Sequence, residues 1–288
     1  MLNKKILITG ANGQLGSELR ELAASYPQFN FNFTDYQELS IINEEAVIKF
    51  FDDYQPGFCI NCAAYTAVDK AEDLAERELV HKLNADAVGF LAKACKHHHT
   101  KFIHISTDYV FDGNAANPYK PNDPTHPVSV YGITKLDGEK QATENTDAII
   151  IRTAWVYSSF GKNFVKTMVN LMQTKPSLNV VSDQYGTPTY AADLASAIMQ
   201  IIGFGRWEPG IYHYTNEGMI NWFEFAIEIK QYLGADCEVN AIPTSDYPTP
   251  AKRPAYSVLD KSKIKEVFGI NIPEWDESLK VCLSKLLL

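Results

Sequence analysis

A short apolar segment near the start of the chain, KILIT, runs into three glycines spaced three residues apart, as GANGQLG. The amphipathic residues that follow predict a helix from about 13 to 25. Such a turn lets the backbone approach a pyrophosphate, and the new helix offers free N–H groups and the positive end of its dipole. We expect cofactor contacts from Gly10, Asn12, Gly13, Gln14, Leu15 and Gly16.

Apolar segments alternate with helical patterns through the first half of the chain. Helices are expected at about 43–54 and 76–97 and from Tyr131 to about 143, between the segments FNF, FCINCAA, KFIHIS and AIIIRT. This rhythm predicts an α/β fold with a Rossmann-like, doubly wound parallel sheet. Continuously apolar strands are typical of a sheet that helices cover on both faces.

From about residue 156 the pattern loosens, with helices expected at about 163–173, 221–233, 261–268 and 275–287. We interpret this half as a smaller C-terminal substrate lobe, interleaved with the first domain. Residues 1–156, with returning elements at about 176–204 and 236–260, form the expected NAD(P)-binding domain. Residues of about 157–175, 205–235 and 261–288 form the expected lobe.

Asp35 follows the second expected strand, where an acidic side chain hydrogen-bonds the adenosine ribose in dinucleotide-binding folds. Its charge would repel a ribose 2′-phosphate. The sequence therefore favours NADH, or tolerance of both NADH and NADPH. The alternative is that Asp35 serves as a helix cap or turn residue.

The segment YGITK places Tyr131 and Lys135 four residues apart, on one face of a helix. A lysine ammonium beside a tyrosine lowers the pKa of the phenol, which can then exchange a proton with a carbonyl or alcohol oxygen. The pair alone is a weak signal, because about one such spacing is expected by chance in this composition.

The strand KFIHIS ends in Ser106 and Thr107, at the same edge of the sheet as Gly10. Thr107 would donate a hydrogen bond to the substrate oxygen that Tyr131 protonates. The hydride would come from the cofactor. The glycine turn, the strand end and the Tyr–Lys pair together predict a carbonyl reductase site, with Thr107, Tyr131 and Lys135 as its catalytic residues.

The amino-acid composition limits the kinds of partner and compartment that we expect for this chain. A net charge of −9 without a long basic segment argues against nucleic acid, and no apolar segment approaches the length of a membrane span. The apolar start of the chain is also too short for a signal peptide. Five scattered cysteines favour free thiols in a reducing cytoplasm, and Cys59 and Cys62 read as buried strand residues rather than a redox pair.

Six motifs, in order, carry a further resemblance: NCAAYTAVDKAE, STDYVFDG, YGITK, RTAWVY, DQYGTPTY and RPAYSVLD. Together they resemble the dTDP-4-dehydrorhamnose reductase family of the extended short-chain dehydrogenase/reductase superfamily. The resemblance implies NADPH- or NADH-dependent reduction of the carbon-4 ketone of dTDP-6-deoxy-L-lyxo-4-hexulose, the last step to dTDP-L-rhamnose for cell-surface polysaccharides.

The same resemblance implies further contacts. The loop that runs past the cofactor would contain Ala63, Ala64 and Tyr65. The cofactor would also contact Tyr131 and Lys135. Ser106, Thr107, Trp155, Gln184, Thr187, Thr189 and Arg253 would contact the substrate. Trp155 reads alternatively as a core aromatic, whereas an Arg253 guanidinium suits a diphosphate by its chemistry as well.

Several alternatives stay open. Tyr256 and Ser40 stand where the family commonly has Asn and Asp. An epimerase or 4,6-dehydratase on the same scaffold is a second interpretation, although dehydratases usually carry Glu at the position of Tyr109. A non-catalytic regulatory subunit is a third.

No metal site is predicted: consecutive histidines at 97–99 point apart on a helix. A Mg²⁺ requirement and a homodimer are left open.

Overall fold

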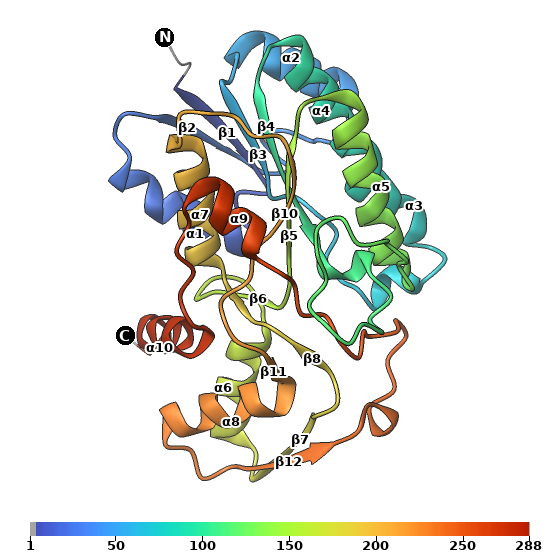
Figure 1. Cartoon of the computed structure of the whole chain (residues 1–288), viewed down its shortest axis with the longest axis vertical. Helices are drawn as coiled ribbons and strands as arrows, with labels where there is room; N and C mark the ends of the chain where they lie inside the picture. The colour runs from blue at the N-terminus through green and yellow to red at the C-terminus, as the bar shows by residue number, and fades with distance from the viewer. Residues whose placement is uncertain (1–3, 288) are drawn as a thin grey trace.

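A computed structural model describes residues 4–287, so that residues 1–3 and Leu288, at the outer ends of the expected domains, lie outside the described range. Its main element is a six-stranded parallel sheet in the order β10-β5-β4-β3-β1-β2 (Figure 1). The strands are β1 Lys5–Thr9, β2 Asn30–Thr34, β3 Phe58–Asn61, β4 Lys101–Thr107, β5 Ile149–Thr153 and β10 Gly210–His213.

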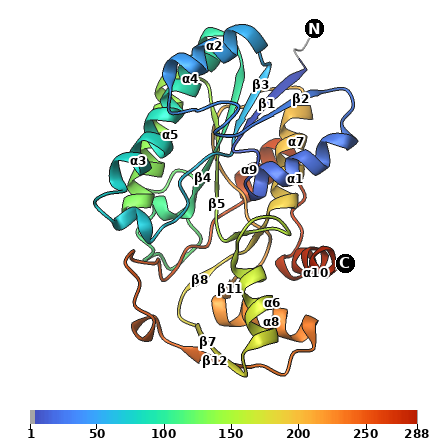
Figure 2. The same ribbon diagram turned by 180° about the vertical axis from the view of Figure 1, so that it is seen from behind.

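Side chains alternate between the two faces of this sheet, and both faces are buried. Ile6 and Ile8 of β1 pack on one side, and Leu7 packs on the other. Helices therefore cover both faces (Figure 2). One layer comprises α1 Gln14–Leu22, α7 Ala191–Gly203 and α9 Ser262–Phe268. The other comprises α2 Glu44–Tyr54, α3 Arg77–His81, α4 Ala87–His97 and α5 Val130–Asn145.

The helix expected at 76–97 is interrupted. A π-helical turn, Lys82–Asp86, separates α3 from α4. Within it, the Asn84 side chain accepts a hydrogen bond from the Tyr65 backbone N–H (2.8 Å) and donates to the Tyr65 carbonyl oxygen and to Thr134. The extra residue in the turn thus ties the loop after β3 to helix α5.

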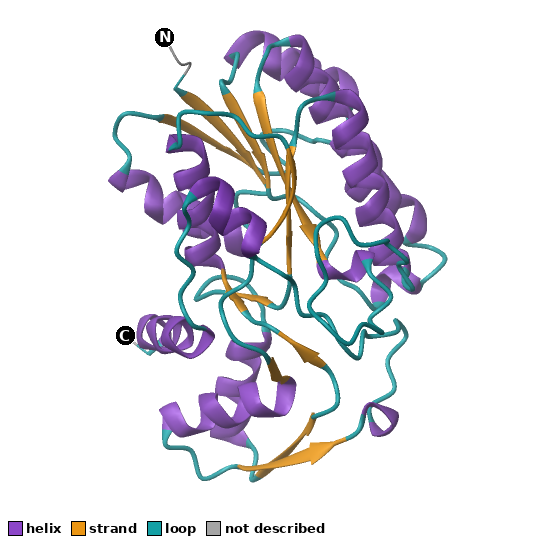
Figure 3. Ribbon diagram, viewed as in Figure 1, coloured by secondary structure: helices purple, strands orange, loops and turns teal. Residues whose placement is uncertain are grey.

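A second apolar core lies below the sheet edge in the smaller lobe (Figure 3). Its helices are α6 Phe164–Thr174, α8 Trp222–Leu233 and α10 Trp275–Leu286. Its strands form three pairs: β7 Ser177–Val181 with β12 Glu238–Ile242, β8 Tyr185–Gly186 with β11 Ile220–Asn221, and β6 Val156–Tyr157 with β9 Thr189–Tyr190.

The structure divides the second half differently from the sequence expectation. β7 and β12 pair in the lobe, whereas the segments at about 176–204 and 236–260 were expected to return to the first domain. β10 joins the main sheet, and α9 packs on that sheet's core, although both fall in segments assigned to the lobe. Local patterns do not encode which distant strand becomes a partner.

Candidate active site

A cavity of about 1310 Å³ opens at the carboxyl ends of the main strands, between the sheet and the lobe. Of the residues expected to bind cofactor, those that line it are Gly10, Gly13, Gln14, Leu15, Asp35, Ala63, Ala64, Tyr131 and Lys135. Of those expected to bind substrate, the lining includes Ser106, Thr107, Trp155 and Arg253. The cavity is large enough for a dinucleotide and a second ligand.

The glycine turn is closely packed. Gly10 has a positive φ of 65°, and a Cβ there would lie 2.6 Å from the Ala63 nitrogen. A Cβ on Gly16 would lie 2.5 Å from the Gly10 carbonyl oxygen. Gly13 caps α1 without a side-chain hydrogen bond, which leaves the first N–H groups of the helix available to an anion. The turn therefore fits a pyrophosphate.

Asp35 is fixed at the cofactor end of the cavity by backbone groups. Its Oδ2 accepts a hydrogen bond from the Asn12 N–H (3.0 Å), and its Oδ1 accepts one from the Tyr36 N–H (2.8 Å). Asn12 itself and Gly16 support the turn but do not line the cavity. A ribose hydroxyl can donate to this carboxylate, whereas a 2′-phosphate would meet its negative charge.

The strand end of β4 continues into a short 3₁₀ turn that carries two unexpected side chains. The Thr107 hydroxyl donates to Asp108 Oδ1 (2.9 Å) and accepts from the Tyr109 N–H (3.2 Å). Asp108 and Tyr109 both line the cavity. Burial raises the pKa of the Asp108 carboxyl to about 6 and the pKa of Tyr109 well above its usual value.

Tyr131 lies in the first turn of α5, which Ser129 caps through the Gly132 N–H (3.1 Å). Its ring packs edge-on against Tyr109, with 5.5 Å between centroids. Burial raises the pKa of Tyr131 to about 12, although a hydrogen bond with Thr107 lowers it. The expected lowering of this pKa by Lys135 is therefore not what the structure shows.

Lys135 points along the β4 backbone. Its Nζ donates to the Ile105 carbonyl oxygen (2.6 Å) and lies 3.4 Å from His104 Nε2. Burial lowers the pKa of Lys135 to about 8, against the opposing effect of Glu139. The ammonium is bound to the strand carbonyl oxygen instead of to the phenol, so it does not offset the effect of burial, which raises the pKa of Tyr131.

Ser106 lines the cavity, but its hydroxyl donates to Glu139, which forms a bidentate ion pair with Arg152. Its hydrogen is therefore committed to the protein. Tyr65 also turns away from the cavity and donates from its hydroxyl to Glu76 (3.0 Å). Ser106 is therefore at the cavity, as the sequence interpretation expected, with its hydroxyl hydrogen bound to Glu139, whereas Tyr65 is not part of the cavity lining.

On the substrate side, Trp155 stacks on Trp222 of α8, with 3.5 Å between ring centroids and 11° between planes. Arg253 lines the cavity and pairs with Asp69 through one nitrogen (2.6 Å). Three expected contacts lie outside the lining: Gln184 donates to Thr244, Thr187 to the Gly218 carbonyl oxygen and Thr189 to the Ala154 carbonyl oxygen.

Four cavity or supporting residues were missed: His104, Asp108, Tyr109 and Trp222. Asp108 and Tyr109 directly follow Thr107, so their position after the end of the strand could have indicated that they too lie at the cavity. Trp222 belongs to a helix far along the chain and gives no local signal.

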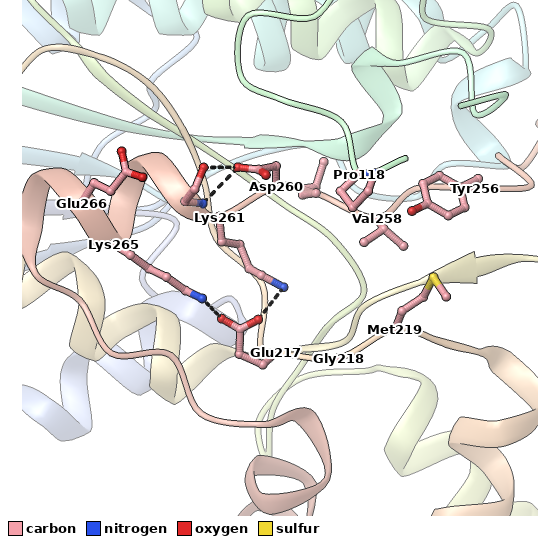
Figure 4. Close-up of a pocket in the computed structure, with 12 residues that line it drawn as sticks. Pro118, Glu217, Gly218, Met219, Tyr256, Val258, Asp260, Lys261, Lys265 and Glu266 are labelled. Atoms are coloured by element: carbon pink, nitrogen blue, oxygen red, sulfur yellow. Dashed lines mark hydrogen bonds and ion pairs between the residues drawn. The ribbon is translucent and has the colours of Figure 1, made fainter. Parts of the chain in front are cut away.

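A second cavity, of about 640 Å³, shares no lining residue with this site. Figure 4 shows the side chains that line it. Glu217 there bridges Lys261 and Lys265. Tyr256, which stands where the family commonly has Asn, lines this second cavity and not the first.

Within residues 4–287, no helix is both long and apolar enough to cross a membrane. The same range contains no group of three or more His, Cys, Asp or Glu side chains placed to hold a metal ion.

Comparisons of the sequence and of the structure with known proteins point to the same family. The family model described as the RmlD substrate binding domain matches residues 4–288. A dTDP-4-dehydrorhamnose reductase from Aggregatibacter actinomycetemcomitans is 43% identical over 287 residues, covering 96% of this chain and 97% of the relative.

Two solved structures are similar over nearly the whole chain. A dTDP-4-dehydrorhamnose reductase from Clostridium acetobutylicum superposes with a TM-score of 0.94 at 44% identity, covering 99% of this chain and 100% of the other. The enzyme from Bacillus anthracis, solved in complex with NADP, gives 0.93 at 35% identity, covering 98% and 99%. The chain therefore belongs to the dTDP-4-dehydrorhamnose reductase family.

Proposed function

We propose that this chain reduces the carbon-4 ketone of dTDP-6-deoxy-L-lyxo-4-hexulose to give dTDP-L-rhamnose, with NADH or NADPH as the reductant. The observation that carries the proposal is the convergence of Thr107, Tyr131 and Lys135 on one cavity with the glycine turn. The cofactor supplies the hydride. The protein supplies the proton and orients the ketone.

Tyr131 is the proton donor. A pKa of about 12 keeps its phenol protonated near neutral pH, which is the form that a reduction requires. As hydride reaches carbon 4, negative charge develops on the ketone oxygen, and the Tyr131 proton neutralises it. Lys135 lines the same cavity and adds positive charge to the site, while its Nζ stays bound to the Ile105 carbonyl oxygen.

The cofactor end suits NADH at least as well as NADPH. The Asp35 carboxylate is held by two backbone N–H groups, so it cannot swing away from an added phosphate without losing them. The NADP complex of the B. anthracis relative supports tolerance of the phosphate in the family. We infer a protein that uses both cofactors and prefers NADH.

The substrate end suits a nucleoside diphosphate sugar. The stacked Trp155 and Trp222 provide an aromatic wall, and Arg253 provides a cation beside it. Arg253 Nη1 is buried and has no hydrogen-bond partner among the described residues, so it can donate to a diphosphate oxygen. Gln184, Thr187 and Thr189 would then act by shaping the backbone near the substrate.

The residue type at position 109 favours the reductase over the dehydratase alternative. Dehydratases usually place Glu at this position, as a second acid beside Asp. Here a phenol with a strongly raised pKa occupies it. The intact Thr107, Tyr131 and Lys135 argue equally against a non-catalytic subunit.

The reaction is expected in the cytoplasm, where reduced cofactor is regenerated. The five cysteines are free thiols in the structure, which suits a reducing compartment. The product would serve cell-surface polysaccharide synthesis.

One assay tests the function. Purified protein is mixed with NADH or NADPH, and the absorbance of the reduced nicotinamide is followed with and without the dTDP-4-keto-hexulose. We expect consumption in the presence of this sugar nucleotide alone. A protein that consumes no cofactor but co-purifies with tightly bound NAD⁺ would indicate an epimerase or dehydratase instead.

A further inference from the structure

Asp108 is a buried acid that the reaction described above does not use. It follows Thr107 at the end of β4, lines the main cavity and is 3% exposed. Its Oδ1 is hydrogen-bonded to the Thr107 hydroxyl at 2.9 Å. Its Oδ2 is buried and has no hydrogen-bond partner within residues 4–287.

An ionised Asp108 fits these contacts poorly. A carboxylate can only accept, so the single hydroxyl hydrogen of Thr107 would point at Asp108 and away from the substrate. The negative charge would also be shared with Oδ2, a buried oxygen without a hydrogen-bond partner within residues 4–287, which disfavours this form. Such an anion would oppose the negative charge that develops on the ketone oxygen.

A neutral Asp108 satisfies the same atoms without moving them. Its hydroxyl donates from Oδ1 to Thr107 Oγ1 across the same 2.9 Å separation, and Oδ2 becomes a carbonyl oxygen of low charge. Thr107 Oγ1 then accepts from both Asp108 and the Tyr109 N–H. The Thr107 hydrogen is thereby released toward the cavity, where Tyr131 also lies beside Thr107.

We propose that Asp108 is a positioning residue which, in its neutral form, donates to Thr107 and so directs the Thr107 hydrogen to the ketone oxygen that Tyr131 protonates. The inference rests on the proposed function. Asp108 keeps its proton throughout: the ketone oxygen takes a proton from Tyr131, and carbon 4 takes the hydride from the reduced nicotinamide.

The surroundings of Asp108 agree with a neutral acid. Burial raises its pKa to about 6, and this outweighs the hydrogen bonds from Thr107 and Ser257. The titratable groups that interact with it are Tyr131 of α5 and Tyr109 of its own turn, and the Arg253 guanidinium acts on Tyr109. Within residues 4–287, no Lys or Arg forms an ion pair with Asp108.

The test is the pH dependence of kcat/KM for the sugar nucleotide. In the wild-type protein we expect kcat/KM to fall above a pH of about 6, by up to roughly tenfold per pH unit. In Asp108→Asn the amide N–H donates to Thr107 at every pH. This variant should keep kcat/KM within about fivefold of wild type at the acidic end and lose the decline above it. Asp137→Asn, on the outer face of α5, makes the same chemical change away from the cavity and should keep the wild-type profile.

Two results would overturn the inference. One is a loss of activity of about a hundredfold or more in Asp108→Asn at every pH, with NADH affinity and thermal stability retained, because the carboxylate would then be required. The other is persistence of the decline in this variant.

An infrared difference spectrum gives a reading that needs no turnover. We expect a protonated-carboxyl stretch in the wild-type protein below a pH of about 6 that Asp108→Asn lacks. Absence of this band would exclude the neutral acid. Its presence in a protein that does not reduce the sugar nucleotide would place the failure in the proposed function instead.

Discussion

At the scale of single residues, we propose that the proton that the reaction consumes comes from Tyr131. Replacing Tyr131 with Phe removes the proton and keeps the ring packed against Tyr109. We expect kcat to fall by about 10²–10⁴-fold, the usual contribution of a positioned acid, while the Kd for NADH changes less than about twofold. Steady-state kinetics and cofactor titration measure the two quantities.

Tyr232→Phe is the matched control, since the Tyr232 hydroxyl lies on the lobe surface and contacts Ser284. It should leave both quantities unchanged. A Tyr131→Phe protein whose NADH affinity falls as much as its kcat would show that Tyr131 holds the cofactor and does not act as the acid.

We propose that the preference between NADH and NADPH also depends on one residue, Asp35. Asp35→Asn removes the negative charge but keeps an oxygen for one of the two backbone N–H groups. We expect the ratio of kcat/KM for NADPH to that for NADH to rise by about tenfold, which corresponds to about 1.4 kcal/mol. Asp53→Asn, an exposed carboxylate of α2, should leave the ratio unchanged. An unchanged ratio in Asp35→Asn as well would remove Asp35 from the recognition of the ribose.

The residues of the site could be named from the sequence more readily than their chemical states. Spacing placed Tyr131 and Lys135 on one helix face, and both line the cavity. Spacing does not show that Lys135 donates to the Ile105 carbonyl oxygen or that Ser106 donates to Glu139. Those partners depend on how β4 and α5 pack, so the direction of the Tyr131 pKa shift could not be predicted.

At the scale of elements, helix positions followed from periodicity, with α2 and α8 beginning one residue after the expected start. The π-helical turn between α3 and α4 was not predicted, because one inserted residue barely disturbs an apolar pattern of this length. The assignment of β10 to the main sheet was missed for another reason. A strand of four residues carries little local signal of its partner.

The buried ion pair between Glu139 and Arg152 joins α5 to β5, and Glu139 also binds Ser106 of β4. The two side chains are 3% and 2% exposed. Glu139→Gln leaves the guanidinium buried without a counter-charge, so we expect the free energy of unfolding to fall by about 3–5 kcal/mol. Urea denaturation measures this change.

Asp137→Asn on the same helix breaks an exposed pair with Lys140 and should cost no more than about 0.5 kcal/mol. If Glu139→Gln costs as little as this control, the buried pair does not hold the three elements together.

At the scale of the whole molecule, the site depends on how the lobe meets the sheet. Trp155 follows β5 and has a positive φ of 48°, which is unusual for a residue with a side chain. Trp222 opens α8 in the lobe, and the two indoles stack directly on one another in the lining of the cavity. The stack therefore joins the lobe to the segment after β5 at the part of the cavity that we propose for the substrate.

Removing this stack should weaken the binding of the sugar nucleotide without weakening the binding of NADH. We expect Trp222→Ala to raise the KM for the sugar nucleotide by about two- to tenfold, because an aromatic pair contributes about 0.5–1.5 kcal/mol beyond its buried area. The KM for NADH should change less than about twofold. Trp222→Phe keeps a stacking ring and should restore most of the affinity, whereas Trp207→Phe, beside Asp147 at the far end of β5, should change neither constant. Equal increases in both KM values for Trp222→Ala would mean that the stack supports the fold of the whole cavity instead of the substrate end.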